Sequence, residues 1–137
     1  MKHSYRKTIF ALALAVFLIG VTVPVLARVT SIGVDEAYEL VQKHGGDEDF
    51  VILDVRTPGE YADGRLENAL NIDYYADTFK DELDALDRSK TYLVYCRTGG
   101  RSGRTLRMME ELGFQNVYNM KGGFTSWQQK KYPVAGS

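Results

Sequence analysis

The stretch TYLVYCRTGGRS, residues 91–102, decides the fold, because an apolar run in it ends directly before the only cysteine of the chain. Residues 91–95 predict a buried strand. Apolar side chains then recur at helical spacing and Gly113 provides a stop, so a helix is predicted over 102–112. The cysteine, Cys96, therefore opens a loop that joins a strand to a helix.

This loop favours an anion at its centre. Gly99 and Gly100 allow the backbone to curl so that several N–H groups point inward, and the following helix adds the positive end of its dipole. The sulfur of Cys96 is the natural occupant, so its pKa is expected to lie below the value of about 8.5 for a free thiol. The alternative is a structural thiol, since free cysteine is among the most buried residue types.

The length of the loop indicates which anion fits. A phosphate cradle of the tyrosine-phosphatase or arsenate-reductase kind needs five residues between cysteine and arginine, which would place arginine at position 102. Ser102 stands there, and Arg101 comes one residue earlier. The tighter ring suits one additional sulfur atom better than a tetrahedral oxyanion.

Strand and helix patterns alternate along the chain, which predicts an α/β sandwich with a mostly parallel sheet. Strands are predicted at 50–55, 69–72, 91–95 and 116–120, and helices at 33–44, 79–86, 102–112 and 124–130. A turn with a short helix is expected over 56–64. In open parallel sheets, active residues lie beyond the carboxyl ends of strands, where both Cys96 and Arg56 fall.

The cysteine loop resembles that of the rhodanese (sulfurtransferase) family, and further segments match the family in order over about residues 31–133. These segments are Ile52-Leu53-Asp54-Val55-Arg56, Pro58-Gly59-Glu60-Tyr61, Gly64, Ala69-Leu70-Asn71-Ile72, and Gly122-Gly123 followed by Trp127. The resemblance implies a five-stranded sheet with helices on both faces. Two departures, Gly64-Arg65-Leu66 in place of Gly-His-Ile and Asn68 in place of a common glycine, affect a surface turn and leave the loop intact.

The resemblance implies that Cys96 carries a persulfide cradled by the loop, whose candidate members are Arg97, Thr98, Gly99, Gly100, Arg101 and Ser102. The hydroxyls of Thr98 and Ser102 either donate to the bound sulfur or cap the helix. Arg101, and more weakly Arg97, either pairs with the sulfonate of a donor or is an exposed loop charge.

Supporting roles are expected for Asp54, Arg56 and Glu60, as an ion pair that orders the turn beside the loop. His44 is the only histidine beyond the first 27 residues, and nothing in the spacing brings it to Cys96 as a general base. One cysteine and one histidine cannot build the usual zinc site, so no metal and no cofactor is expected.

The implied activity is transfer of sulfane sulfur from thiosulfate or a similar donor anion to a thiol, cyanide or protein acceptor, in ping-pong fashion. The alternative is a rhodanese-like module that carries or senses sulfur, or docks a partner, without turnover. Nucleic acid is not expected as a partner, because the net charge is −1 and the pI about 6.1. Residues 97–137 nevertheless hold 7 basic and 2 acidic residues, a field that attracts small anions.

The first 27 residues differ from the rest. Lys2, Arg6 and Lys7 precede an uncharged stretch over 8–26, and Val25-Leu26-Ala27 is a small-residue cleavage pattern. This arrangement predicts a signal peptide at 1–27 and export, in a bacterial cell to the periplasm; residues 8–27 are also long enough for a retained membrane anchor. The rhodanese-like domain is then 28–137, about 110 residues, enough for one compact core.

Overall fold

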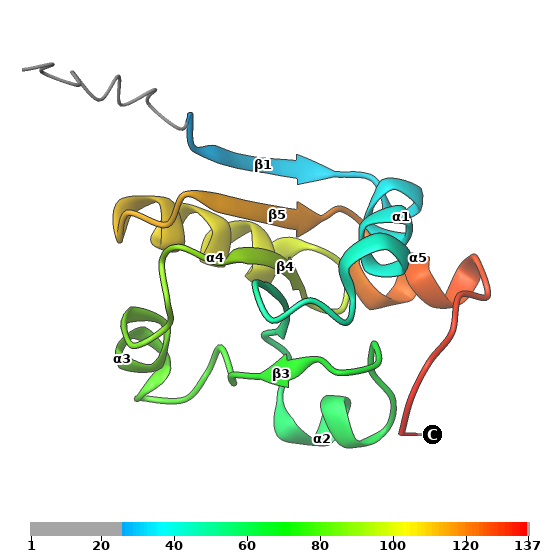
Figure 1. The fold of residues 1–137 in the computed structure, drawn as a ribbon. Coiled ribbons are helices and arrows are strands. Elements are labelled where there is room, and N and C mark those ends of the chain that lie inside the picture. Colours follow the sequence, from blue (N-terminus) through cyan, green and yellow to red (C-terminus); the bar gives the residue numbers. More distant parts are fainter. Residues whose placement is uncertain (1–25, 137) are drawn as a thin grey trace, which may run out of the picture.

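The computed structural model describes residues 26–136, in which strands and helices alternate. The elements are β1 (Arg28–Ile32), α1 (Val34–His44), β2 (Phe50–Asp54), α2 (Pro58–Ala62), β3 (Leu70–Asn71), α3 (Phe79–Asp84), β4 (Thr91–Tyr95), α4 (Gly100–Glu111), β5 (Asn116–Met120) and α5 (Gly123–Gln129). The expected α/β class is confirmed (Figure 1).

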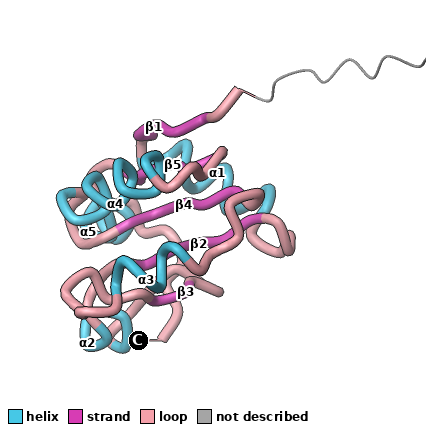
Figure 2. Tube along the Cα trace, turned by 90° about the vertical axis from the view of Figure 1, so that its left-hand side faces the viewer, coloured by secondary structure: helices cyan, strands magenta, loops and turns pink. Residues whose placement is uncertain are grey.

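The five strands form one parallel sheet in the order β1-β5-β4-β2-β3 (Figure 2). The neighbouring strands β2 and β4 are in register from Phe50 opposite Thr91 to Asp54 opposite Tyr95. Since all strands run the same way, their carboxyl ends meet at one edge. Arg56 and Cys96, which follow β2 and β4, are thereby brought to the same edge of the sheet.

Each face of the sheet is covered by helices over its own apolar core. Side chains along β4 alternate between the two: Leu93 and Tyr95 pack in the core with α1 and α5, whereas Tyr92 and Val94 pack in the core with α3 and α4. This period of two follows from the pleat of a strand. Cys96 continues it, so its side chain lies on the α4 face.

The helices begin and end close to their predicted limits, and the differences have local causes. α1 starts at Val34, with Asp35 and Glu36 in its first turn as expected. α4 begins at Gly100, two residues earlier than predicted, because Gly99 takes a left-handed conformation with φ of 107° and the chain turns helical at once. α5 similarly begins after Gly122, with φ of 77°.

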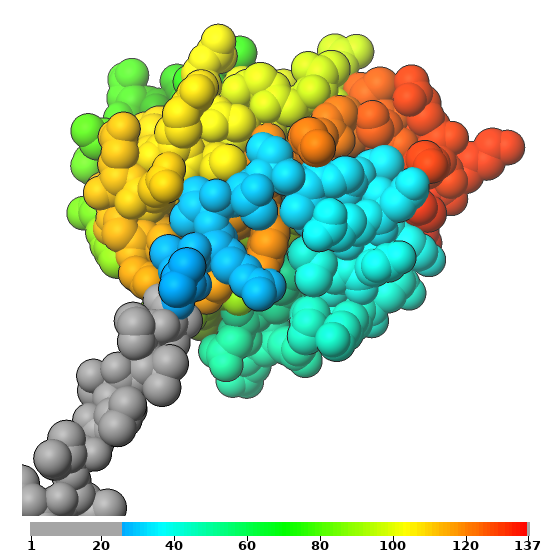
Figure 3. All heavy atoms as spheres, turned by 90° about the horizontal axis from the view of Figure 1, so that it is seen from above, coloured from blue at the N-terminus to red at the C-terminus, as the bar shows by residue number. Residues whose placement is uncertain are grey.

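The two edge strands depart most from the residue pattern. β3 has only two residues, Leu70 and Asn71, rather than the four predicted over 69–72. No residue pattern predicted β1: its sequence, Arg-Val-Thr-Ser-Ile, is largely exposed, and it lies on the surface beside β5 and α1 (Figure 3). Backbone pairing with β5 along its whole length holds this strand in place, and Ile32 at its end is its one buried side chain.

The predicted signal peptide falls almost wholly on residues 1–25, outside the described part of the chain. Within residues 26–136, no helix has both the length and the apolar character that crossing a membrane requires.

Candidate functional site

Cys96 follows the last residue of β4, and the loop after it wraps around its sulfur. The amide of Gly99 donates to Sγ at 3.1 Å, and the hydroxyl of Ser102 lies 3.3 Å from the same atom. The left-handed Gly99 turns the chain back toward the cysteine, which a residue with a side chain rarely does. The loop is therefore an arrangement of donors that converge on one sulfur atom.

Helix α5 packs against the outside of the cysteine loop and holds the first peptide groups of the loop in place. Phe124 donates its N–H to the carbonyl of Cys96 at 2.8 Å, and Thr125 donates to the carbonyl of Arg97 at 3.0 Å. Because N–H and C=O point in opposite directions across a trans peptide, holding the Arg97 carbonyl outward turns the amide of Thr98 inward.

The close approach of α5 depends on Gly123. A Cβ atom at this position would lie closer to the Cys96 carbonyl oxygen than any real contact allows, and its φ of 56° favours glycine as well. The Gly122-Gly123 pair that the sequence singled out is thus part of the loop's support.

The environment favours the thiolate. Burial raises the pKa of the Cys96 thiol, but hydrogen bonds from the Ser102 hydroxyl and from loop amides outweigh it, so the pKa lies below its ordinary value. These amides belong to Ser102, Gly99 and Thr98. The twelve-residue helix α4 begins inside the loop and adds the positive end of its dipole.

Cys96 is nonetheless only 1% exposed, and it packs with the apolar core on the α4 face. Both descriptions considered from sequence therefore hold in part: the thiol is buried, and it is also hydrogen-bonded by its loop. Burial limits contact with bulky oxidants and partner thiols, while the converging donors stabilise negative charge on the sulfur.

The two hydroxyls of the loop differ. Ser102 is fully buried and directs its hydroxyl to the sulfur of Cys96 itself. Thr98 is exposed; it contributes its amide, and no hydrogen bond of its hydroxyl is seen in the part of the chain described. Neither residue caps α4, whose N-cap is Gly99.

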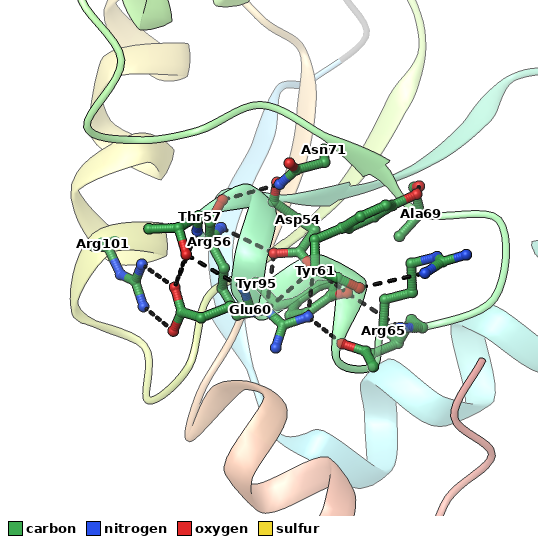
Figure 4. A network of polar contacts seen from close by, with 12 residues as sticks. Asp54, Arg56, Thr57, Glu60, Tyr61, Arg65, Ala69, Asn71, Tyr95 and Arg101 are labelled. Carbon is green, nitrogen blue, oxygen red and sulfur yellow. Dashed lines mark hydrogen bonds and ion pairs between the residues drawn. The ribbon is translucent and has the colours of Figure 1, made fainter. Parts of the chain in front are cut away.

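Arg101 is engaged by a carboxylate and is not an open anion site. Its two terminal nitrogens donate to the two carboxylate oxygens of Glu60 at 2.8 and 2.9 Å, a bidentate pair (Figure 4). Thr57 and Glu60 cap α2 reciprocally, which fixes the carboxylate. The Arg101 hydrogen bonds lower the pKa of Glu60 to about 2, and those from Thr57 contribute.

The expected ion pair near the turn is present, but Glu60 is not part of it. Asp54 and Arg56 form a buried pair at 2.7 Å, and the hydroxyl of Tyr95 donates to the same carboxylate at 2.7 Å (Figure 4). The guanidinium also donates to the Gly64 carbonyl at 2.6 Å and lies 4.1 Å from the centre of the Phe124 ring. Glu60 instead joins α2 to the cysteine loop.

A cavity of about 410 Å³ adjoins this network, and sequence reasoning missed it. Its lining residues are Arg56, Glu60, Asp63, Arg97, Phe124, Thr125 and Gln128. They come from the end of β2, from α2, from the cysteine loop and from α5, so only folding brings them together. Arg56, Glu60 and Arg97 were singled out from the sequence, but nothing in the sequence indicated that they share a cavity.

His44 lies at the opposite end of the sheet. It lines a cavity of about 210 Å³ with residues from the amino ends of β2 and β4, and its ring nitrogen is 2.8 Å from Asp47. A Cys-His pair is thus not formed by these residues. Among residues 26–136, no group of three or more acidic, histidine or cysteine side chains is arranged to hold a metal ion.

Residues 35–130 match the family model of the rhodanese-like domain. The chain belongs to the rhodanese-like family. Its relatives include the thiosulfate sulfurtransferase GlpE of Coxiella burnetii, 36% identical over 93 residues (68% of this chain, 81% of the relative). The putative sulfurtransferase YtwF of Bacillus subtilis is 32% identical over 94 residues, covering 69% of this chain and 88% of the relative.

Solved structures agree with this assignment. A rhodanese-related protein from Thermoplasma volcanium superposes with a TM-score of 0.68 at 30% identity, covering 79% of this chain and 99% of the other. A rhodanese-like domain protein from Staphylococcus aureus gives 0.61 at 31% identity, covering 72% and 90%. The rhodanese-like chain described here is therefore a sulfurtransferase-family protein with a single cysteine, at position 96.

Proposed function

We propose that this protein is a sulfurtransferase that moves sulfane sulfur from thiosulfate or a similar anion to a thiophilic acceptor through a persulfide on Cys96. The observation that carries the proposal is the convergence of the Gly99 amide and the Ser102 hydroxyl on the cysteine sulfur, with the thiol pKa below its ordinary value. A thiolate held by fixed donors is the nucleophile that such a transfer requires.

In the first half-reaction, the Cys96 thiolate attacks the outer sulfur of thiosulfate. A sulfur–sulfur bond forms to Cys96, the bond to the sulfonate sulfur breaks, and sulfite leaves with that electron pair. In the second, the acceptor attacks the outer sulfur and the Cys96 thiolate is regenerated. The two steps share one covalent intermediate, so ping-pong kinetics follow, and no separate general base is needed.

The size of the ring supports sulfur transfer over phosphate chemistry. Four residues separate Cys96 from Arg101, and that arginine is already bound to Glu60 on both nitrogens. A tetrahedral phosphate would need both a wider ring and a free guanidinium. Hydrolysis of p-nitrophenyl phosphate by the purified protein would argue against this interpretation.

Intact-mass spectrometry tests the proposal directly. After thiosulfate, the wild-type protein gains one sulfur atom, and cyanide removes it with release of thiocyanate. Cys96→Ala keeps the fold, checked by circular dichroism, and gains nothing. Retained thiocyanate formation in the Cys96→Ala protein rejects the mechanism.

The burial of Cys96 favours one alternative, a rhodanese-like module that holds or senses sulfur, or docks a partner, with negligible turnover. The same experiment separates the two. Repeated cycles of loading and discharge support the enzyme. A stable adduct that acceptors do not remove supports the carrier, and no adduct with any donor supports a docking role.

We also propose that residues 1–27 direct export and that residues 28–137 act as one domain outside the cytoplasm. The basic start, the uncharged stretch and the small residues before position 28 support this, and β1 begins at Arg28. Amino-terminal sequencing of the protein from fractionated cells tests it. An amino terminus at Met1 in the membrane fraction indicates a retained anchor over 8–27, and the same terminus in the cytosol refutes export.

A further inference from the structure

Strand β1 lies at one edge of the sheet and uses one side of its backbone to pair with β5. Figure 2 shows it at the end of the row of strands, and β5 is its one neighbour among the strands described. The N–H of Arg28 donates to the Gln115 carbonyl at 2.6 Å. The N–H of Lys121 donates to the Ile32 carbonyl at 2.9 Å. Both ends of β1 therefore turn their peptide groups toward β5.

The other side of this backbone is open. In a parallel pair, every second residue of a strand turns its N–H and C=O groups toward the neighbouring strand, and the residues between turn theirs away. Thr30 therefore faces β5, whereas Val29 and Ser31 direct their N–H and C=O groups outward. Within residues 26–136, no strand or loop pairs with this outer side of β1. An edge of this kind is a template for one more strand.

β1 also lacks the features that usually protect an edge strand. Its sequence, Arg-Val-Thr-Ser-Ile, contains no proline, no lysine and no carboxylate, and its pairing with β5 has no bulge. The opposite edge strand, β3, is protected because it has only two residues. β1 is therefore the edge of this sheet that is able to accept another strand.

The outer side of β1 is complementary to itself. When a second copy pairs antiparallel with the twofold axis at Thr30, Val29 lies opposite Ser31 of the second copy, and these two residues exchange both backbone hydrogen bonds. The symmetric pair does the same, so every outward N–H group of the two strands donates to a carbonyl. Thr30 lies opposite its own counterpart in a pair without backbone hydrogen bonds, where side chains are closest. Facing threonines stabilise such a pair.

The charges beside β1 favour the same arrangement. In it, Arg28 lies opposite Ile32 of the second copy, and the two Arg28 side chains lie at opposite ends of the contact. Arg28 shares the α1 face of the sheet with Ile32, because an even number of residues separates them. Glu36 follows closely in the first turn of α1, is exposed and forms no ion pair within residues 26–136. A cation of each copy is thereby brought to the side of a carboxylate of the other.

We infer that β1 is a self-association surface, through which two copies of this chain pair antiparallel about Thr30 and join their sheets into one. The inference is independent of the proposed sulfur transfer. All strands of one copy are parallel, so the two cysteine loops lie at opposite ends of the joined sheet, and the contact covers neither. The contact is one strand wide and smaller than a standard interface, so a weak dimer is expected.

A charge exchange at Thr30 tests this by sedimentation equilibrium, in which the mean mass of the purified wild-type protein should rise from monomer toward dimer with concentration. Thr30→Glu and Thr30→Lys each place like charges directly opposite one another and should each raise the dissociation constant about fivefold. An equimolar mixture of the two variants places opposite charges across the axis and should restore the wild-type dissociation constant or lower it.

Gln129→Glu and Gln129→Lys are the matched controls, because Gln129 is exposed at the end of α5 and is not part of β1. They should leave the dissociation constant unchanged, and circular dichroism checks that every variant is folded. Wild-type protein that stays monomeric up to about 1 mM overturns the inference. So does a dimer that the Thr30 variants do not weaken, or one that the mixture weakens as much as each variant alone.

Cysteine cross-linking locates the axis independently. In an antiparallel pair without backbone hydrogen bonds, the two Cα atoms lie about 4.5 Å apart, within the range of about 4.4–6.8 Å that a disulfide spans. Since Cys96 is buried, Thr30→Cys adds one accessible thiol to each chain. In air, this variant should form a disulfide-linked dimer far faster than Gln129→Cys, as seen on non-reducing gels. Equal rates in the two variants overturn the axis at Thr30.

Discussion

Two arginine–carboxylate pairs flank the cysteine loop, and their burial differs. Arg56 and Asp54 are 4% and 0% exposed and lie on the α5 face, where Tyr95 and Gly64 complete their hydrogen bonds. Arg101 and Glu60 are 14% and 26% exposed and join the loop itself to α2. The first pair holds the scaffold at the carboxyl edge of the sheet, and the second holds the shape of the loop.

The length of its shortest hydrogen bond does not by itself decide how much an ion pair contributes to stability. The shortest contacts of the two pairs, 2.7 and 2.8 Å, are nearly equal. A buried charge that loses its partner cannot be rehydrated, whereas a partly exposed one can. The pair of Arg56 and Asp54 should therefore contribute more to the free energy of unfolding. The pair of Arg101 and Glu60 should determine how that free energy and the geometry of the loop change with pH.

Removal of the buried partner is expected to have the largest effect. Asp54→Ala leaves the Arg56 charge without its carboxylate and should lower the free energy of unfolding by about 3–5 kcal/mol. Urea denaturation of the two proteins measures this. The double variant Asp54→Leu, Arg56→Met removes both charges and should recover most of the lost unfolding free energy. If Asp54→Ala lowers the unfolding free energy by less than about 1 kcal/mol, the buried pair contributes no more to stability than the exposed one.

Glu60→Gln tests the loop pair and should cost about 1–2 kcal/mol near neutral pH, since the carboxylate is partly exposed. The pKa of Glu60 is lowered in the folded state, to about 2 from an ordinary value of 4.5. The stabilisation is therefore fully present above about pH 4.5 and is lost as the pH falls through 2. Unfolding free energies of both proteins across this range should converge; a constant difference would contradict the assignment.

Ser102→Ala tests the direct contact with the sulfur. Loss of the hydroxyl, which donates more strongly to the thiolate than to the thiol, should raise the pKa of Cys96 and slow iodoacetamide alkylation at neutral pH by about three- to tenfold. Alkylation rates across pH locate the pKa. Thr105→Val is the control, because it removes a buried hydroxyl of α4 that bonds the Arg101 carbonyl and not the sulfur. Equal effects of both changes would mean that packing, and not donation to sulfur, is responsible.

The smallest effect is expected from an exposed ion pair far from the loop. Lys130 lies 2.9 Å from Asp35, and both side chains are at least half exposed. Lys130→Met should leave the thermal midpoint and the persulfide loading rate unchanged within error, because water and salt screen such pairs. If Lys130→Met destabilises the protein as much as Glu60→Gln, the contribution of an ion pair to stability does not follow its burial.

The sequence correctly predicted the helices and strands in which apolar residues recur at regular spacing and a terminating residue or loop follows. α1, β2, β4, β5 and the cysteine loop all belong to this group, and their positions agree with prediction to within two residues. β1 could not be found this way, since an exposed edge strand has no apolar alternation and is held by pairing with a strand almost ninety residues later.

The residues of the site were easier to predict from the sequence than the contacts between them. The sequence pointed to Glu60 and Arg101 separately, but not to their contact, because the residues are 41 positions apart. The Tyr95 hydroxyl was missed for a related reason: an aromatic residue in a buried strand predicts packing, and only the folded sheet brings Asp54 within 2.7 Å of it. The register of β2 against β4, which no local pattern specifies, determines the contact between Tyr95 and Asp54. The contact between Glu60 and Arg101 depends instead on how α2 and α4 are placed at the same edge of the sheet.

The contact between α5 and the backbone of residues 96 and 97 has a consequence for the order of folding. The peptide groups around the thiol acquire their orientation from the last helix described, more than twenty positions downstream. Before that helix docks, these peptide groups are not held in place, and we expect the pKa of the Cys96 thiol to lie closer to its ordinary value. We therefore expect the pKa of the Cys96 thiol to fall only late in folding, once nearly the whole domain has assembled, so that little thiolate is present while the chain is still growing.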